Sequence, residues 1–222
     1  MVWSFCTICL YLHQINLLNL YACAYYACDF ATYLRLWGQL DKSLFSKDAL
    51  ELIEQNAKNN IKTEDVYLFF DTETSGLPTD YNAPATHINN WPRLIQISWI
   101  LATKTKEIIC EKDYIVEPNG FSISSESTAI HGITNEIAMQ KGKDIGIILK
   151  DFLADLDKAN YIIGHNVSFD VNVVNAELIR KGYTNTNIHK KQICTMKSSV
   201  NICKIPDFKG RYKYPKLQEL YD

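Results

Sequence analysis

Strand-like and helix-like segments follow one another between residues 66 and 196 in an order that few folds can accommodate. The apolar runs 94–102 and 108–116 are joined by the short polar turn 104–107, which predicts an antiparallel hairpin. After Pro118-Asn119-Gly120, helical patterns alternate with short apolar segments. The expected strands are 66–70, 94–102, 108–116, 161–164 and 192–196, and the expected helices are 46–58, 134–141, 145–158, 168–181 and one opened by Pro215. A meander followed by strand–helix alternation predicts a mixed α/β sheet with helices on its faces.

The first 45 residues differ from the rest of the chain. Asp29 and Arg35 are the only charged residues among the first forty, and residues 2–28 carry none. A segment of that length could cross a bilayer, but no Lys or Arg flanks its start and four polar residues interrupt it: His13, Gln14, Asn16 and Asn19. Three interpretations remain, namely a poor membrane anchor, a hydrophobic helical extension, and sequence translated upstream of the true start. We favour the last two, so a membrane partner is not expected.

Charge is distributed unevenly along the chain. The formal net charge is only −2, yet the segment 180–216 holds ten Lys and Arg residues and a single acid, Asp207. Such a segment suits a surface that meets a polyanion, or it is simply a solvated basic face. Among the seven cysteines, a C-x2-C…C-x4-C series lies in apolar surroundings without turn residues, so zinc is not expected: Cys6, Cys9, Cys23 and Cys28. The other three indicate reduced thiols and a cytoplasmic protein: Cys110, Cys194 and Cys203.

Two carboxylates follow the first predicted strand. In "LFFDTETSGLP" Asp71 and Glu73 are two residues apart, so on extended chain they point to one side. Two carboxylates on one side repel each other unless a cation lies between them, and Mg²⁺ is bound through one or two carboxylates plus phosphate oxygens. In "YIIGHNVSFD" Asp170 falls in the first turn of a helix that follows a buried strand. There it either favours the helix start or joins Asp71 and Glu73 in one acidic site.

The chain resembles the DEDD-type 3′–5′ exonucleases of the DnaQ-like group, within the ribonuclease H-like superfamily. "FFDTETSGLP" matches the first motif of that family and "IIGHNVSFD" matches its second. The resemblance covers residues 64–222, which we expect to form the exonuclease domain after the extension 1–45 and a leading helix and linker at 46–63. The fold it implies is a ribonuclease H-like mixed sheet, an antiparallel meander followed by parallel strands, flanked by helices.

After Asp170, where the family has its third motif, neither His-x4-Asp nor Tyr-x3-Asp occurs. The fifth residue after His189 is Cys194, and no Tyr of the C-terminal segment has an Asp four residues on. "YPKLQELYD" resembles the segment shortly before that motif, so the expectation is a domain incomplete at its C-terminus, with impaired activity.

The resemblance implies two-metal phosphodiester hydrolysis with two Mg²⁺ ions, for which Mn²⁺ can substitute. Asp71, Glu73 and Asp170 would be the catalytic metal ligands. The terminal nucleotide would be received by a further set of residues: Thr74, Gly76, Leu77, His131, Asn166 and Phe169. The implied partner is the 3′ end of single-stranded DNA or RNA, and a DNA polymerase is a second candidate partner. The alternative functions are an inactive module that binds nucleic acid or a polymerase, and a membrane-associated protein.

Overall fold

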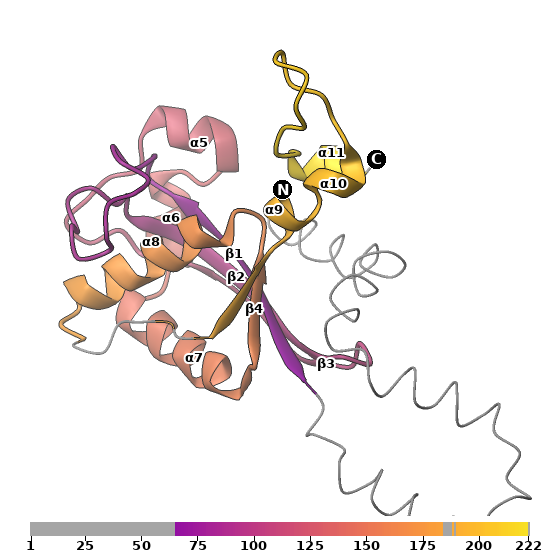
Figure 1. Cartoon of the computed structure of the whole chain (residues 1–222). Coiled ribbons are helices and arrows are strands. Elements are labelled where there is room, and N and C mark those ends of the chain that lie inside the picture. Colours follow the sequence, from indigo (N-terminus) through magenta and orange to yellow (C-terminus); the bar gives the residue numbers. More distant parts are fainter. Residues whose placement is uncertain (1–64, 184–187, 189, 222) are drawn as a thin grey trace, which may run out of the picture. The chain divides into compact units, whose positions relative to one another are not determined.

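The computed structural model describes residues 65–183, 188 and 190–221. The extension 1–45, the helix expected at 46–58 and the cysteine series 6–28 lie outside these residues. The described part forms a five-stranded sheet of order β3-β2-β1-β4-β5 (Figure 1). β1 (Val66–Thr74), β2 (Leu94–Thr103) and β3 (Ile108–Ile115) pair antiparallel, while β4 (Tyr161–Gly164) and β5 (Lys191–Cys194) continue the sheet in parallel with β1. The mixed α/β sheet is therefore confirmed.

β1 is longer than the sequence predicts. The apolar pattern placed its end at Phe70, but pairing with β2 continues to Thr74, so Asp71 and Glu73 lie within the strand. The prediction was wrong because backbone hydrogen bonds to β2 do not depend on side-chain polarity. The two acids keep a common orientation, since Asp71 lies opposite Ser98 and Glu73 opposite Gln96.

Helices cover the sheet after the meander. They are α5 (Ser125–His131), α6 (Asn135–Lys141), α7 (Ile145–Lys158), α8 (Val167–Arg180), α9 (Thr195–Ser198), α10 (Val200–Cys203) and α11 (Leu217–Tyr221). The predicted helices 134–141, 145–158 and 168–181 are confirmed to within one residue at each end. Pro215 lies two residues before α11 rather than in its first turn. α5, α9 and α10 were missed, since elements of four to seven residues show too few turns for apolar periodicity.

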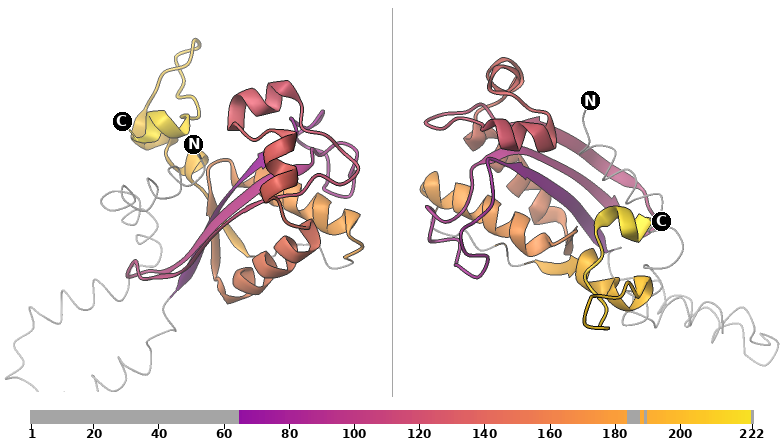
Figure 2. Two further views of the ribbon diagram at one scale, coloured as in Figure 1. Left: turned by 180° about the vertical axis from the view of Figure 1, so that it is seen from behind. Right: turned by 90° about the horizontal axis from the view of Figure 1, so that it is seen from above.

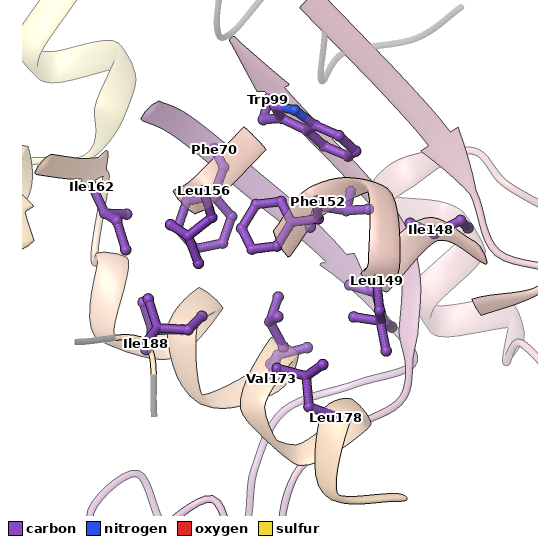
Figure 3. Packing of buried hydrophobic residues seen from close by; sticks show 14 of the residues in the cluster. Phe70, Trp99, Ile148, Leu149, Phe152, Leu156, Ile162, Val173, Leu178 and Ile188 are labelled. Carbon is purple, nitrogen blue, oxygen red and sulfur yellow. The ribbon is translucent and has the colours of Figure 1, made fainter. Parts of the chain in front are cut away.

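The main core lies between one face of the sheet and helices α7 and α8, which the views of Figure 2 place on the same side. Figure 3 shows Phe70 and Trp99 directed towards Phe152 of α7, and their ring centroids lie 5.3 Å from that of Phe152 in both cases. Alternate residues of β1, Leu68 and Phe70, belong to this core. Asp71 and Glu73, which alternate with Phe70 and Thr72 along β1, therefore point to the opposite face.

A buried carboxylate ties α7 to the outer strands. Asp155 accepts hydrogen bonds from Trp99 Nε1 at 3.0 Å and from the Cys110 thiol at 3.4 Å, and it forms ion pairs with Lys112 and Lys158 at 2.8 and 2.7 Å. Burial by itself raises the pKa of Asp155, but the hydrogen bonds from Lys112, Lys158 and Trp99 outweigh it and hold the pKa below its ordinary value. The ionised form is therefore the one that the fold stabilises.

Asp155→Asn is expected to make stability less dependent on pH. Because the folded pKa is depressed, the contribution of Asp155 is complete above the pKa of the unfolded chain, about 3.9, and is lost as the pH falls below it. Urea unfolding should show that the substitution costs about 1.5–3 kcal/mol at pH 7 and progressively less towards pH 3. A cost that stays constant from pH 7 to pH 3 would contradict this account.

No helix within the described residues is long and apolar enough to cross a membrane. Cys110, Cys194 and Cys203 are half-buried and are not joined by disulfides, and their redox state stays a prediction.

Candidate active site

Asp71 and Glu73 lie in the carboxyl-terminal part of β1. They point to the sheet face opposite α7 and α8, next to Ser98 and Gln96 of β2. Beyond Glu73 the chain turns, and this turn is fixed to the start of β2 by two hydrogen bonds. Ser75 N donates to Arg93 O at 2.9 Å, and Arg93 N donates to Ser75 Oγ at 2.9 Å. The position of both carboxylates is therefore set by sheet pairing on one side and by the turn on the other.

Asp170 reaches β1 from the first turn of α8. Its carboxylate is 2% exposed, and Oδ1 accepts hydrogen bonds from Thr72 N at 3.0 Å and from Thr72 Oγ1 at 2.6 Å. Asp170 lies in the first turn of α8, whose N-cap residue Asn166 has a left-handed φ of 66° and makes no capping side-chain bond. Of the two roles that the sequence left open, the structure places Asp170 against the residue between Asp71 and Glu73.

The three carboxylates influence one another. Burial, partly offset by the Thr72 N–H, raises the pKa of Asp71 to about 6. Burial and then the neighbouring charge of Asp71 raise the pKa of Glu73 to about 7. Burial and the charge of Asp71 also raise the pKa of Asp170 well above its usual range, against the hydrogen bonds from Thr72. Asp71 is thus the common neighbour of the other two acids, and a positive charge beside it would stabilise the ionised forms.

The donor set suits a hard divalent cation. Carboxylate oxygens are the ligands that Mg²⁺ prefers, and one or two of them suffice when phosphate oxygens and water complete the shell. Within the described residues no three His, Cys, Asp or Glu side chains converge on a single metal position. Successive side chains of β1 point to opposite faces of the sheet. Asp71 and Glu73 therefore lie on one face, while Asp170 binds Thr72 on the other. The arrangement therefore fits ligation through pairs of carboxylates around Asp71.

A polar strip beside the acids was missed by the sequence analysis. Gln96 Nε2 and Ser98 Oγ both donate to Asp113 Oδ1 at 2.6 Å, and register places all three on the face of Asp71. Gln96 and Ser98 are both buried. The sequence could have indicated these two residues, since "LIQISWIL" has two polar residues, two positions apart, in an otherwise apolar strand.

The residues after Glu73 form an exposed turn. Thr74 Oγ1 donates to the Gly76 carbonyl at 2.7 Å, and the side chain of Leu77 is 73% exposed. Thr74, Gly76 and Leu77 therefore adjoin the acids along the chain, and Leu77 is available to a ligand. Their role in binding a nucleotide stays a prediction.

Three other residues predicted to bind the nucleotide lie in or next to helices α5 and α8. Phe169 packs on the core, with its ring centroid 6.3 Å from that of Trp91 and 6.4 Å from that of Tyr81. Asn166 lies in the loop before Asp170. His131 ends α5, where its Nδ1 accepts from Ile133 N at 3.1 Å and its Nε2 is buried without a hydrogen-bond partner in the described part of the chain. His131 therefore holds the turn that follows α5, and its role in binding a nucleotide stays a prediction.

The basic segment divides into structural and exposed parts. Arg180 is engaged by Glu177 and by the carbonyls of the loop before β2, so it is a structural residue. The later part of the segment follows β5 at the carboxyl end of the parallel strands, where His165 Nε2 donates to Pro215 O at 3.1 Å. His165 follows β4 directly, and Gly164 before it lies against the backbone of Phe70. The segment is thereby anchored beside the residue that precedes Asp71.

Thr72 is expected to position Asp170. Thr72→Val keeps the β-branched shape and removes the hydroxyl donor, so it should cost about 1–2 kcal/mol of stability in urea unfolding. It should also weaken Mg²⁺ binding in titration calorimetry by about 10–100-fold, as loss of a hydrogen bond to a ligand does. Thr72→Ser keeps the donor and should restore both. Equal losses in the Val and Ser variants would contradict this role.

Comparison with curated proteins gives PolC-type DNA polymerases as relatives. DNA polymerase III PolC-type of Streptococcus suis is 31% identical over 159 residues, 71% of this chain and 10% of that protein. DNA polymerase III PolC-type of Streptococcus pyogenes serotype M2 is 34% identical over 117 residues, 53% of this chain and 7% of that protein. The chain thus spans a tenth or less of the length of these curated relatives.

Solved structures agree on the fold. E. coli Exonuclease I in complex with a 5cy-dA13 oligonucleotide matches with a TM-score of 0.52 and 20% identity, over 65% of this chain and 31% of that chain. A product-bound structure of exonuclease I matches with a TM-score of 0.54 and 19% identity, over 69% of this chain and 37% of that chain. The family model RNase_T, described as exonuclease, matches residues 68–222 and so includes Asp71, Glu73 and Asp170. The chain therefore belongs to the RNase_T exonuclease family, in the DnaQ-like group of the ribonuclease H-like superfamily.

Proposed function

We propose that the chain contains a 3′–5′ exonuclease domain, spanning residues 64–222, that hydrolyses phosphodiester bonds at the 3′ ends of single-stranded DNA or RNA. The observation that carries the proposal is the group of three carboxylates, buried Asp170 and partly buried Asp71 and Glu73, in which Asp71 interacts with each of the other two, within a domain of the exonuclease family. Carboxyl groups whose pKa values are raised in this way mark sites built to meet a cation or to handle protons.

The residues have distinct parts in this reaction. Two divalent ions, Mg²⁺ or Mn²⁺, would supply the charge that stabilises the attacking and leaving oxygens of the phosphate. Asp71 would contribute to holding both ions because it neighbours both other acids, Glu73 on its own strand and Asp170 on α8. Thr72 fixes Asp170, and the exposed turn at Thr74, Gly76 and Leu77 would receive the terminal nucleotide.

Support for the substrate comes from the relatives. The exonuclease I structures include complexes with oligonucleotides, and the PolC-type relatives are DNA polymerases. A single-stranded 3′ end is therefore the proposed substrate, and a DNA polymerase is a proposed partner of the longer protein to which such a domain can belong.

The test uses two labelled versions of one oligonucleotide. With Mg²⁺, a 5′-labelled strand should shorten one nucleotide at a time while a 3′-labelled strand releases labelled mononucleotide at once, and EDTA should abolish both. Release from the 5′ end first would contradict the direction, and internal cuts would contradict exonuclease action. Binding of the oligonucleotide with no release under any divalent ion would favour a non-catalytic nucleic-acid-binding module.

A further inference from the structure

The segment between α10 and α11 forms a structured hairpin that the proposed site does not use. Pro206 and Tyr212 form an antiparallel bridge, Asp207 N donates to Arg211 O at 2.6 Å, and Lys213 N donates to Ile205 O at 2.9 Å. Figure 1 shows this yellow loop projecting away from the sheet above α10 and α11. We call residues 205–213 the 205–213 hairpin.

The tip of the hairpin displays aromatic rings to solvent. Phe208 is 93% exposed, the highest value among the large apolar side chains described, and Tyr212 and Tyr214 are about half exposed. Lys209 Nζ lies 5.2 Å from the centroid of the Phe208 ring. Since an exposed phenylalanine contributes nothing to the core, a free aromatic face beside a cation indicates a binding role.

The segment around the hairpin carries a net positive charge, and its single acidic residue binds groups within the hairpin. Residues 204–216 contain five Lys and Arg residues and one acid, Asp207. Asp207 Oδ1 accepts from Lys209 N and Arg211 N at 2.8 Å each, and its Oδ2 lies 3.3 Å from Arg211 Nε. The carboxylate therefore holds the turn closed instead of facing an incoming anion. Within the described residues no ion pair is recorded for three of the cations, Lys204, Lys209 and Lys216.

The hairpin is attached next to the candidate active site. Its C-terminal end continues into buried Pro215, whose carbonyl accepts from His165 Nε2, and His165 lies in the loop that carries α8 and Asp170. Lys213 Nζ is further held 2.5 Å from Glu219 Oε1 of α11. The C-terminal end of the hairpin is thereby fixed to the loop that precedes α8, the helix that carries Asp170.

We propose that the 205–213 hairpin binds the single strand upstream of its 3′ end, with Phe208 and Tyr212 stacking on bases and Lys209 with its neighbours contacting phosphates. Alternation of exposed aromatic and cationic side chains is how proteins hold single strands without reading sequence. DNA and RNA share this chemistry. The inference rests on the proposed function for the identity of the polymer, but not on turnover.

The test measures binding and cutting separately. Binding of the full chain to fluorescein-labelled dT20 and rU20 is followed by anisotropy in EDTA, where no turnover occurs. Phe208→Ala and Tyr212→Ala should each weaken binding by about tenfold or more, as loss of one stacked base does. Ile130→Ala, which removes an apolar side chain on α5 that is 80% exposed, is the matched control and should bind as wild type.

Two further readouts define the outcome. Lys209→Gln should lower the slope of log affinity against log salt concentration by about 0.7, and Lys150→Gln on α7 should not. Hydrolysis of thymidine 5′-p-nitrophenyl phosphate, a single-nucleotide substrate without an upstream strand, should be unchanged in the control Ile130→Ala. If the wild type cuts nothing while the hairpin variants still lose binding, the proposed function fails and this inference stands. Unchanged dT20 and rU20 affinity in Phe208→Ala and Tyr212→Ala, or losses matched by Ile130→Ala, would overturn it and leave the hairpin as a surface for a protein partner.

Discussion

Asp71→Asn is expected to lower Mg²⁺-dependent release of nucleotides from a single-stranded 3′ end by about a thousand-fold or more. Asp71 is the common neighbour of Glu73 and Asp170, so losing its charge removes the centre of the proposed cation site. Stabilisation of a phosphoryl transition state by bound metal amounts to several kcal/mol, and each ~1.4 kcal/mol corresponds to tenfold in rate. The measurement is kcat/KM on a 3′-labelled oligonucleotide.

Measurements of stability and of Mg²⁺ binding distinguish a loss of metal binding in Asp71→Asn from a loss of folding. Asn has the shape of Asp without its charge, so the variant should be at least as stable as wild type without metal, because a carboxylate destabilised by burial is gone. Mg²⁺ should raise the Tm of wild type but not of Asp71→Asn. Asp157→Asn, on the exposed side of α7, should match wild type in both assays. Nuclease activity that survives Asp71→Asn would remove Asp71 from the mechanism.

Glu177→Ala is expected to cause the largest loss of stability. The Glu177 side chain is 1% exposed, and Oε1 accepts from Arg93 Nε at 2.7 Å, Arg180 Nη1 at 2.8 Å and Leu94 N at 3.2 Å. Removing the carboxylate leaves two guanidinium groups and a backbone N–H without their acceptor. Breaking a buried ion pair on one side costs about 3–5 kcal/mol. Urea unfolding followed by circular dichroism measures this loss.

Two variants test the origin of that loss. Glu177→Gln keeps an acceptor for Leu94 N but lacks the charge, so its stability should lie between those of wild type and Glu177→Ala. Glu117→Ala replaces an exposed acid and should change stability by no more than about 0.5 kcal/mol. Because Arg180 also donates to Ile88 O and Trp91 O, loss of the carboxylate should loosen the loop before β2. A loss below about 1 kcal/mol in Glu177→Ala would show that the arginines find other partners.

The longer helices and strands could be predicted because their patterns of apolar and polar residues repeat over several turns or over a whole hairpin. α7 agrees with its prediction, from Ile145 to Lys158, since fourteen residues give a clear apolar face. The hairpin of β2 and β3 followed from two apolar runs around a short turn. The end of β1 and the short helices could not be predicted from such patterns. Pairing with β2 determines where β1 ends, and hydrogen bonds at the helix caps determine where a short helix such as α5 begins and ends.

The sequence by itself predicted the three residues of the proposed acidic site, Asp71, Glu73 and Asp170. Asp71 and Glu73 had to share a side because they are two apart on extended chain, and "FFDTETSGLP" with "IIGHNVSFD" identified the family that the comparisons confirm. Only the tertiary structure decided how Asp170 joins them. The bond of Asp170 to Thr72, the bonds of Gln96 and Ser98 to Asp113, and the bond of Glu177 to Arg93 each join distant parts of the chain, and these partners are 15 to 98 positions apart. Such contacts depend on strand register and helix placement, which no local pattern records.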